Sequence, residues 1–404
     1  MTTITDPPQG AFRLSMLLND TRYRSYTFQF IALIVLIVSI AFLMSNLFSN
    51  LAAAGLNISY QFLGSPAGYD INQTLIEYTS QSTNARAALV GILNTLLVAF
   101  LACVTATIFG VIAGVLRLSN NWLVSKLMSF YVEIFRNIPV LIWIIIIFTI
   151  MIAVLPGPRA FRGDEPSASM VLNAIAFTNR GVYIPAPIWG PGSRVVVATF
   201  ILSIVGVFAY RRYATKLLYD TGRLLPMGWP SLAILFVPTL LVYFVMGMPI
   251  GLDYPALKGF NFAGGIKVGG PLIALWFALS IYTGAFIAEN VRAGIQAISK
   301  GQSEAAGALG LRQGRIMNLV VLPQALRVII PPLISQYLNI TKNSSLAIAV
   351  GYADVTATLG GITLNQTGRA IECVLLLMLF YLTISLSISA VMNVYNNSVK
   401  LKER

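Results

Sequence analysis

The chain has 404 residues, of which 57% are hydrophobic and only 10% are charged. Soluble domains carry about 25% charged residues, so this composition excludes a soluble enzyme, a disordered protein and a disulfide scaffold, and it leaves a polytopic helical membrane protein. The formal net charge is +13, and there is no histidine. The lack of histidine excludes Ser-His-Asp and Cys-His catalysis and every His-ligated metal site. Both cysteines, Cys103 and Cys373, lie in apolar runs, where a thiol packs as a small hydrophobic group.

Runs without charged residues predict eight membrane-spanning helices, because a charge at the bilayer centre costs at least a few kcal/mol and a span needs about 20 apolar residues. In chain order, the runs lie between Arg24 and Asp70, Arg86 and Arg117, Arg136 and Arg159, Arg194 and Arg211, Arg223 and Asp253, Lys267 and Glu289, Arg327 and Asp354, and Glu372 and Lys400. The seventh run is mostly apolar but carries Pro331-Pro332, Lys342 and Asn343-Ser344-Ser345, so it is predicted to be an interrupted helix.

Basic residues predict the orientation of these spans. Eight spans place both termini on one side, and the tails together with loops 117–137, 211–223 and 289–327 hold 18 of the 27 Lys and Arg residues, against 8 in the opposite loops. The positive-inside rule therefore places both termini in the cytoplasm. This distribution accounts for most of the net charge and leaves no basic soluble domain to bind nucleic acid. The apolar run at 28–48 is longer than a signal-peptide core and predicts an uncleaved anchor.

The sequence predicts that energy for any transport comes from another subunit. A Walker A motif needs a Gly directly before its Lys, and no Lys follows a Gly in this chain. The acidic residues Glu133, Glu289 and Glu372 lie at predicted span ends, which disfavours coupling to protons or sodium. An ion-coupled secondary carrier remains the alternative, since sodium sites can be built from backbone carbonyls.

The longest predicted cytoplasmic loop carries the most specific pattern. Ser299 and Gln302 have capping-box spacing and predict the start of a helix. Gly310 predicts the end of that helix, and Pro323 the end of a second one. Small side chains at 305–308 would let another backbone approach closely. By local pattern alone, the two helices could form a docking element or an ordinary amphipathic connector.

This loop resembles the EAA loop of ABC importer permeases. The resemblance rests on Glu304, Ala305, Ala306, Gly307, Gly310, Ile316, Leu322 and Pro323. Segments 131–139, 282–296, 342–346 and 94–96 also resemble the polar amino-acid uptake branch of that family, with departures at Ile138, Asn290, Ala293 and Ser344. In that family the loop inserts into a cleft of the ATP-binding subunit. The resemblance therefore implies a coupling role for Glu304, Ala305, Ala306, Gly307, Gly310, Leu322 and Pro323.

The resemblance also implies an all-α fold: a type I permease core of five helices with three extra spans. The core would comprise residues 88–155 and 271–404, including the coupling loop at 299–323. Residues 1–87 would add a tail, one span and an outer loop, and residues 156–270 would insert two spans. A permease of this length is similar to the first permease of the general L-amino-acid importers, the Aap/Bzt type.

A member of that group would import polar L-amino acids (glutamate, glutamine, aspartate, asparagine and a broader range) across the bacterial inner membrane. The implied partners are a second homologous permease in a heterodimer, a dimeric ATPase, a periplasmic amino-acid-binding protein and the lipid bilayer. The chain itself would catalyse no reaction and hold no cofactor or metal. Mg-ATP would bind to the partner ATPase.

Two further groups of candidate residues follow. Glu133 with Arg136, and Glu289 with Arg292, are acid–base pairs at i,i+3 spacing that could stabilise helix ends or a gate. The interrupted span is predicted to line a substrate path, because irregular backbone in a membrane must face protein or a water-filled cavity. The path candidates are Asn94, Tyr282, Gln336, Asn343, Ser344 and Ser345. The alternative for the serines is a hydrogen bond to their own helix. The loop at 156–194 could contact the binding protein or pack on the extra spans.

Overall fold

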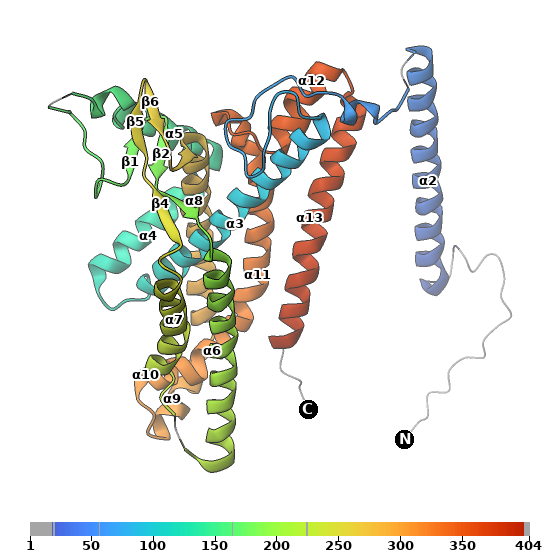
Figure 1. The fold of residues 1–404 in the computed structure, drawn as a ribbon. Coiled ribbons are helices and arrows are strands. Elements are labelled where there is room, and N and C mark those ends of the chain that lie inside the picture. The colour runs from blue at the N-terminus through green and yellow to red at the C-terminus, as the bar shows by residue number, and fades with distance from the viewer. Residues whose placement is uncertain (1–17, 19–20, 56, 164, 224, 400–404) are drawn as a thin grey trace, which may run out of the picture. The chain divides into compact units, whose positions relative to one another are not determined.

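The computed structural model describes residues 18, 21–55, 57–163, 165–223 and 225–399. Within these residues, eight helical segments are long and apolar enough to cross a membrane, which confirms the eight predicted spans (Figure 1). The segments are Tyr23–Ala53, Asn84–Leu116, Val140–Phe161, Ser193–Thr221, Gly228–Val245, Gly270–Gln296, Gln313–Val350 and Ala370–Asn396. The contacts divide the chain into two units, residues 1–61 and 62–404. The first unit contains helix α2 (Thr21–Ala53).

Helix α8 (Gly270–Gln296) is the centre of the second unit. It packs against α3 (Asn84–Leu116), α4 (Trp122–Asn137), α5 (Val140–Val154) and α11 (Leu322–Asn343). Helix α13 (Ala370–Val399) packs on α11.

Small residues let α3 and α8 approach closely, as is usual between membrane helices. A Cβ atom on Gly110 would lie 2.5 Å from Ile287 Cβ, and one on Gly114 would lie 2.7 Å from the Ala288 carbonyl oxygen. These two glycines are therefore contact surfaces for α8, and a larger residue at either position would push the two helices apart.

The segment between α5 and α8 contains strands, so the all-α prediction is incomplete there. Strands β1 (Ala176–Thr178), β2 (Gly181–Ile184) and β7 (Ile266–Gly269) form an antiparallel sheet in the order β1-β2-β7. Two further antiparallel pairs are β3 (Ala186–Trp189) with β4 (Ile250–Asp253) and β5 (Ala256–Lys258) with β6 (Asn261–Ala263). A short helix, η2 (Pro158–Phe161), precedes them.

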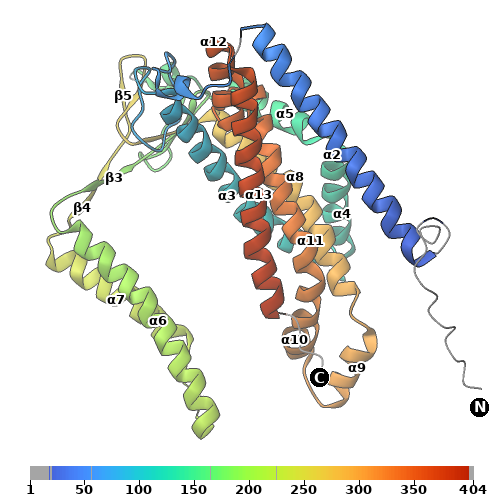
Figure 2. The same cartoon turned by 90° about the vertical axis from the view of Figure 1, so that its right-hand side faces the viewer.

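Helices α6 (Ser193–Thr221) and α7 (Gly228–Val245) follow β3 and precede β4 in the chain, and they pack on each other. The two segments that flank this helical hairpin thus pair with each other and form a ribbon of strands that leads into the hairpin (Figure 2). Strands of three or four residues show too little periodicity to be predicted from sequence.

The seventh span is continuous at the prolines but irregular at Asn343-Ser344-Ser345, so only part of the predicted interruption is confirmed. The double proline Pro331-Pro332 lies inside the continuous helix α11, and Pro323 lies in its first turn instead of ending a helix. A π-helix, η3 (Met317–Val321), directly precedes Pro323. Its wider turn relieves the crowding that a proline ring imposes on the preceding turn. The regular helix ends after Asn343, where the 3₁₀-helix η4 (Ser344–Val350) begins, as the polar cluster at 343–345 predicts.

The two ends of the second unit carry different structures. One end, called the strand-bearing end below, holds η1 (Gln61–Gly64), residues 65–83, the strands, the π-helix η5 (Thr356–Thr363) and α12 (Leu364–Thr367). Hydrogen bonds tie these parts together: Tyr69 Oη lies 3.1 Å from Thr363 Oγ1, and the Gly269 N–H donates to Gln73 Oε1 at 3.0 Å. The opposite end holds α9 (Lys300–Ala308) and α10 (Gln313–Ile316).

Candidate functional site

The predicted coupling loop forms two short helices. Ser299 is the N-cap of α9, as expected, but its side chain makes no capping hydrogen bond, so the predicted capping box does not form. Gly310 follows the end of α9 with φ of +77°, a left-handed conformation that favours glycine and ends helices. The predicted start and end of the first helix are therefore confirmed.

The side chains of this loop divide into a packed face and a free face. Ala306 is buried against Ile316 and Val321, so it holds the two helices together. Glu304, Ala305, Gly307 and Gly310 are exposed, as are Leu322 and Pro323. Leu309, which the sequence pattern did not single out, is 82% exposed at the turn between the helices. At the turn, the loop thus presents a large apolar side chain, Leu309, near small residues and the Glu304 carboxylate.

Glu289 is the centre of an arginine cluster that joins three helices. Its carboxylate accepts a hydrogen bond from Arg117, the C-cap residue of α3, and from Arg292 Nη2 at 2.5 Å on its own helix. Arg136 Nη1 of α4 lies 3.8 Å from the same carboxylate. The Arg136 guanidinium also lies over the Phe286 ring, 5.1 Å from its centroid. The cluster therefore ties α3, α4 and α8 together by charge.

Only one of the two predicted i,i+3 pairs forms. Glu289 and Arg292 contact each other, but Glu133 is exposed and has no ion pair within the described residues. Arg136 turns to Glu289 instead. The prediction of a Glu133–Arg136 pair was wrong because Val132 packs against α8, which points the neighbouring Glu133 away from the bundle.

The predicted substrate-path residues do not gather in one place. Ser344 Oγ donates to the Thr341 carbonyl at 2.7 Å, and Ser345 Oγ donates to the Lys342 carbonyl at 2.8 Å. These bonds confirm the alternative that the serines bond to their own helix. Gln336 and Asn343 are half-buried on α11. Tyr282, on α8, packs its ring 5.1 Å from that of Phe286.

Asn94 is fully buried and contributes to the strand-bearing end. Its Nδ2 donates to the Gln73 carbonyl at 2.8 Å and to the Ala353 carbonyl at 2.9 Å. Both acceptor residues line a cavity of about 650 Å³. Asn94 therefore supports the wall of this cavity.

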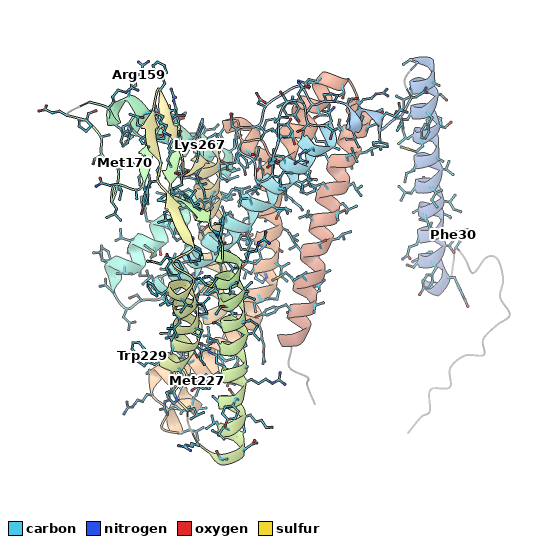
Figure 3. The ribbon with its side chains drawn as sticks, viewed as in Figure 1. Phe30, Arg159, Met170, Met227, Trp229 and Lys267 are labelled. Atoms are coloured by element: carbon cyan, nitrogen blue, oxygen red, sulfur yellow. The ribbon has the colours of Figure 1, made fainter. Side chains whose placement is uncertain are left out.

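The polar residues that line the cavity were missed by sequence reasoning, which used Asp70 and Lys267 only as span boundaries. They are Asp70, Asn72, Gln73, Arg180, Lys267 and Asn365. Lys267 lies in β7, and Arg180 directly precedes β2. Because β2 pairs with β7, the two residues come from neighbouring segments (Figure 3 labels Lys267). One signal was available: the loops predicted to lie outside are expected to be poor in basic residues, and both cations lie in such loops.

Comparison with known proteins agrees with this architecture. The family described as "Binding-protein-dependent transport system inner membrane component" matches residues 203–401. The glutamate/glutamine/aspartate/asparagine transport system permease protein BztB of Rhodobacter capsulatus is 52% identical and aligns over 100% of both chains. The general L-amino acid transport system permease protein AapQ of Rhizobium johnstonii is 45% identical, over 99% of this chain and 98% of its own.

The putative amino-acid ABC transporter permease protein YhdX of Escherichia coli is 44% identical, over 94% of this chain and 95% of its own. Alignments of this identity, over nearly the whole length of three permeases, confirm the resemblance on which the sequence interpretation rests. The chain is a multi-pass membrane protein that belongs to the family of permease subunits of binding-protein-dependent ABC transporters.

Proposed function

We propose that this permease imports polar L-amino acids, among them glutamate, glutamine, aspartate and asparagine, from the periplasm to the cytoplasm. The observation that carries the proposal is the end-to-end identity of 52% with a permease named for these four substrates. The eight spans and the buried helix α8, against which α3, α4, α5 and α11 pack, support a membrane-spanning translocation unit.

ATP hydrolysis belongs to a separate, dimeric ATP-binding subunit that also holds Mg-ATP. The chain has no Lys after a Gly and therefore no Walker A motif. The free face of the α9 loop, with Glu304 and the exposed Leu309, suits insertion into a cleft of such a partner. In this arrangement the permease itself catalyses no reaction and carries no cofactor.

The orientation follows from charge. With 18 of the 27 basic residues in the tails and in the loops that share their side, both termini and the α9 loop face the cytoplasm, and the protein lies in the inner membrane. The strand-bearing end then faces the periplasm, where a substrate-binding protein delivers the amino acid. A second, homologous permease completes a heterodimeric channel.

Uptake into proteoliposomes that contain the complex purified from its native membrane tests this function. We expect uptake of labelled glutamate and glutamine that requires ATP and persists with an uncoupler at constant ATP. Uptake that collapses with the uncoupler would instead identify an ion-coupled carrier. Mass spectrometry of the purified complex should find an ATPase and a second permease, and a chain that purifies alone would contradict the subunit assignment.

The variant Glu304→Lys tests the coupling loop. The substitution replaces an exposed carboxylate on the proposed docking face and buries no new group. We expect membrane insertion at the wild-type level, loss of ATP-driven uptake and loss of the ATPase from the purified complex. Unchanged transport in this variant would show that the α9 loop is not the coupling element.

A further inference from the structure

The cavity at the strand-bearing end is built from four separate parts of the chain. Residues 70–73, Arg180 at the turn before β2, β7 with the start of α8, and residues 348–365 supply its walls. Gln73 joins them, because its side-chain oxygen accepts from the Gly269 N–H at 3.0 Å and its carbonyl accepts from Asn94 at 2.8 Å. Asn94 also holds the Ala353 carbonyl. The buried Asn94 amide thus joins the wall at residues 70–73 to the wall at residues 348–365, so the cavity is pre-formed.

The size of the cavity suits a small polar ligand. Its volume of about 650 Å³ lies within the range of roughly 300–1,000 Å³ that is typical of small-molecule sites. A polar amino acid would fit there together with part of its hydration water.

Three charged residues line the cavity: Asp70, Arg180 and Lys267. The Arg180 guanidinium donates to the Phe260 carbonyl at 3.5 Å. Neither Arg180 nor Lys267 forms an ion pair in the part of the chain that the structure describes. The cavity therefore offers two cations and one carboxylate to a ligand. Since cations are disfavoured in periplasmic loops, their presence at a cavity mouth calls for a local role.

We propose that this cavity is an entrance site for amino acids that prefers dicarboxylic ones. A dicarboxylic L-amino acid carries two carboxylates and one ammonium group at neutral pH, which complements two cations and one carboxylate. Arg180 and Lys267 bind the carboxylates, and Asp70 binds the ammonium group. Charge-assisted hydrogen bonds of this kind are stronger than neutral ones. An amide analogue leaves one cation without a partner, so it binds less well.

This inference rests on the proposed function and adds a site to it. The site lies at the mouth of the permease, where Arg180, Lys267 and Gly269 of the strand-bearing segment contribute to its wall beside residues 70–73 and 348–365. It therefore explains what the inserted strands contribute to transport: they place two cations where the substrate enters.

The test compares initial rates of glutamate and glutamine uptake by the reconstituted complex with one and the same binding protein. Any change in the ratio of the two rates then arises in the permease. We expect one of the two variants Arg180→Gln and Lys267→Gln, the one that removes the partner of the side-chain carboxylate, to lower the glutamate-to-glutamine ratio by about tenfold, the effect of one charge-assisted hydrogen bond. The other variant removes the partner of the α-carboxylate, which both substrates carry, so it should lower both rates and leave their ratio unchanged. Asp70→Asn should lower both rates and leave their ratio unchanged, because both substrates carry the ammonium group.

Arg159→Gln is the matched control, since Arg159 lies at the same end, over the Phe260 ring at 5.9 Å, and does not line this cavity (Figure 3). It should keep the wild-type ratio. Arg180→Lys keeps the charge, so it should restore most of the rate or ratio that Arg180→Gln loses, provided that Arg180→Gln is correctly folded.

Three outcomes would overturn the proposal. A wild-type ratio in both Gln variants, at normal rates, would remove the site and leave the import function intact. An equal loss for both substrates, together with weaker capture of the binding protein, would assign these cations to docking of that protein. Wild-type complexes that transport neither amino acid would overturn the proposed function and the site with it.

Discussion

Replacement of Glu289 tests whether the arginine cluster around it stabilises the packing of α3, α4 and α8. The variant Glu289→Gln keeps the size of the side chain and removes its charge. The carboxylate contacts Arg117, whose side chain is only 12% exposed, and Arg292, while Arg136 lies 3.8 Å away. Without the charge, these cations would repel one another in a partly desolvated site.

The size of the effect follows from burial. Removal of one partner from a fully buried pair costs about 3–5 kcal/mol, whereas an exposed pair contributes at most about 1 kcal/mol. The Glu289 side chain is 23% exposed, so the cost lies between these limits, at about 2 kcal/mol. For a domain of this size, that loss corresponds to a fall in the thermal midpoint of about 3 °C.

The assay is thermal unfolding of the purified permease in mild detergent, followed by intrinsic tryptophan fluorescence. Glu133→Gln is the matched control, because it makes the same chemical change at an exposed carboxylate without an ion pair among the described residues. It should change the midpoint by less than about 1 °C. The difference between the two variants should persist in 0.5 M salt, since partly buried charges are weakly screened. Equal midpoints for the two variants would refute the reasoning.

Gly110→Ala should lower the free energy of unfolding by about 1–3 kcal/mol, because the new methyl group would lie 2.5 Å from Ile287 Cβ. Gly301 lies in helix α9 with open space around it, so Gly301→Ala should leave the thermal midpoint unchanged or raise it in the same assay. Burial raises the pKa of Asp354 to about 6, above its unfolded value of about 3.9, so its ionisation destabilises the fold. The contribution of Asp354 to stability is therefore fully present below pH 4 and is lost as the pH rises through 4–6. Asp354→Asn, which keeps an oxygen for the Ala357 N–H, should therefore raise the midpoint at pH 7.5 and leave it unchanged at pH 4, and an equal shift at both pH values would contradict the assignment.

Several features could be predicted because they are local properties of the chain. The eight spans follow from uncharged apolar runs, since the cost of placing a charge in hydrocarbon acts on each segment separately. The start of α9 at Ser299, its end before Gly310 and the Glu289–Arg292 pair lie within a few residues of the groups that define them. The family pattern of the α9 loop is equally local, and the comparisons confirm the permease family.

The irregular span shows where local rules fail. Proline predicted breaks at Pro323 and Pro331, but packing of α11 against α8 and the π-helical turn before Pro323 keep the helix continuous. The intrinsic cost of a proline, about 3 kcal/mol in a helix interior, is smaller than what tertiary contacts along a span of this length can supply.

Only the tertiary structure decided which distant residues meet. Arg117 reaches Glu289 across 172 residues. Arg136 also lies near Glu289, and that contact replaces the predicted Glu133–Arg136 pair. The β2–β7 pairing and the buried amide of Asn94 assemble the cavity that Asp70, Arg180 and Lys267 line. Burial in lipid selects each span by its own composition, whereas strand pairing and charge clusters depend on chain segments that become neighbours only after the helices have packed.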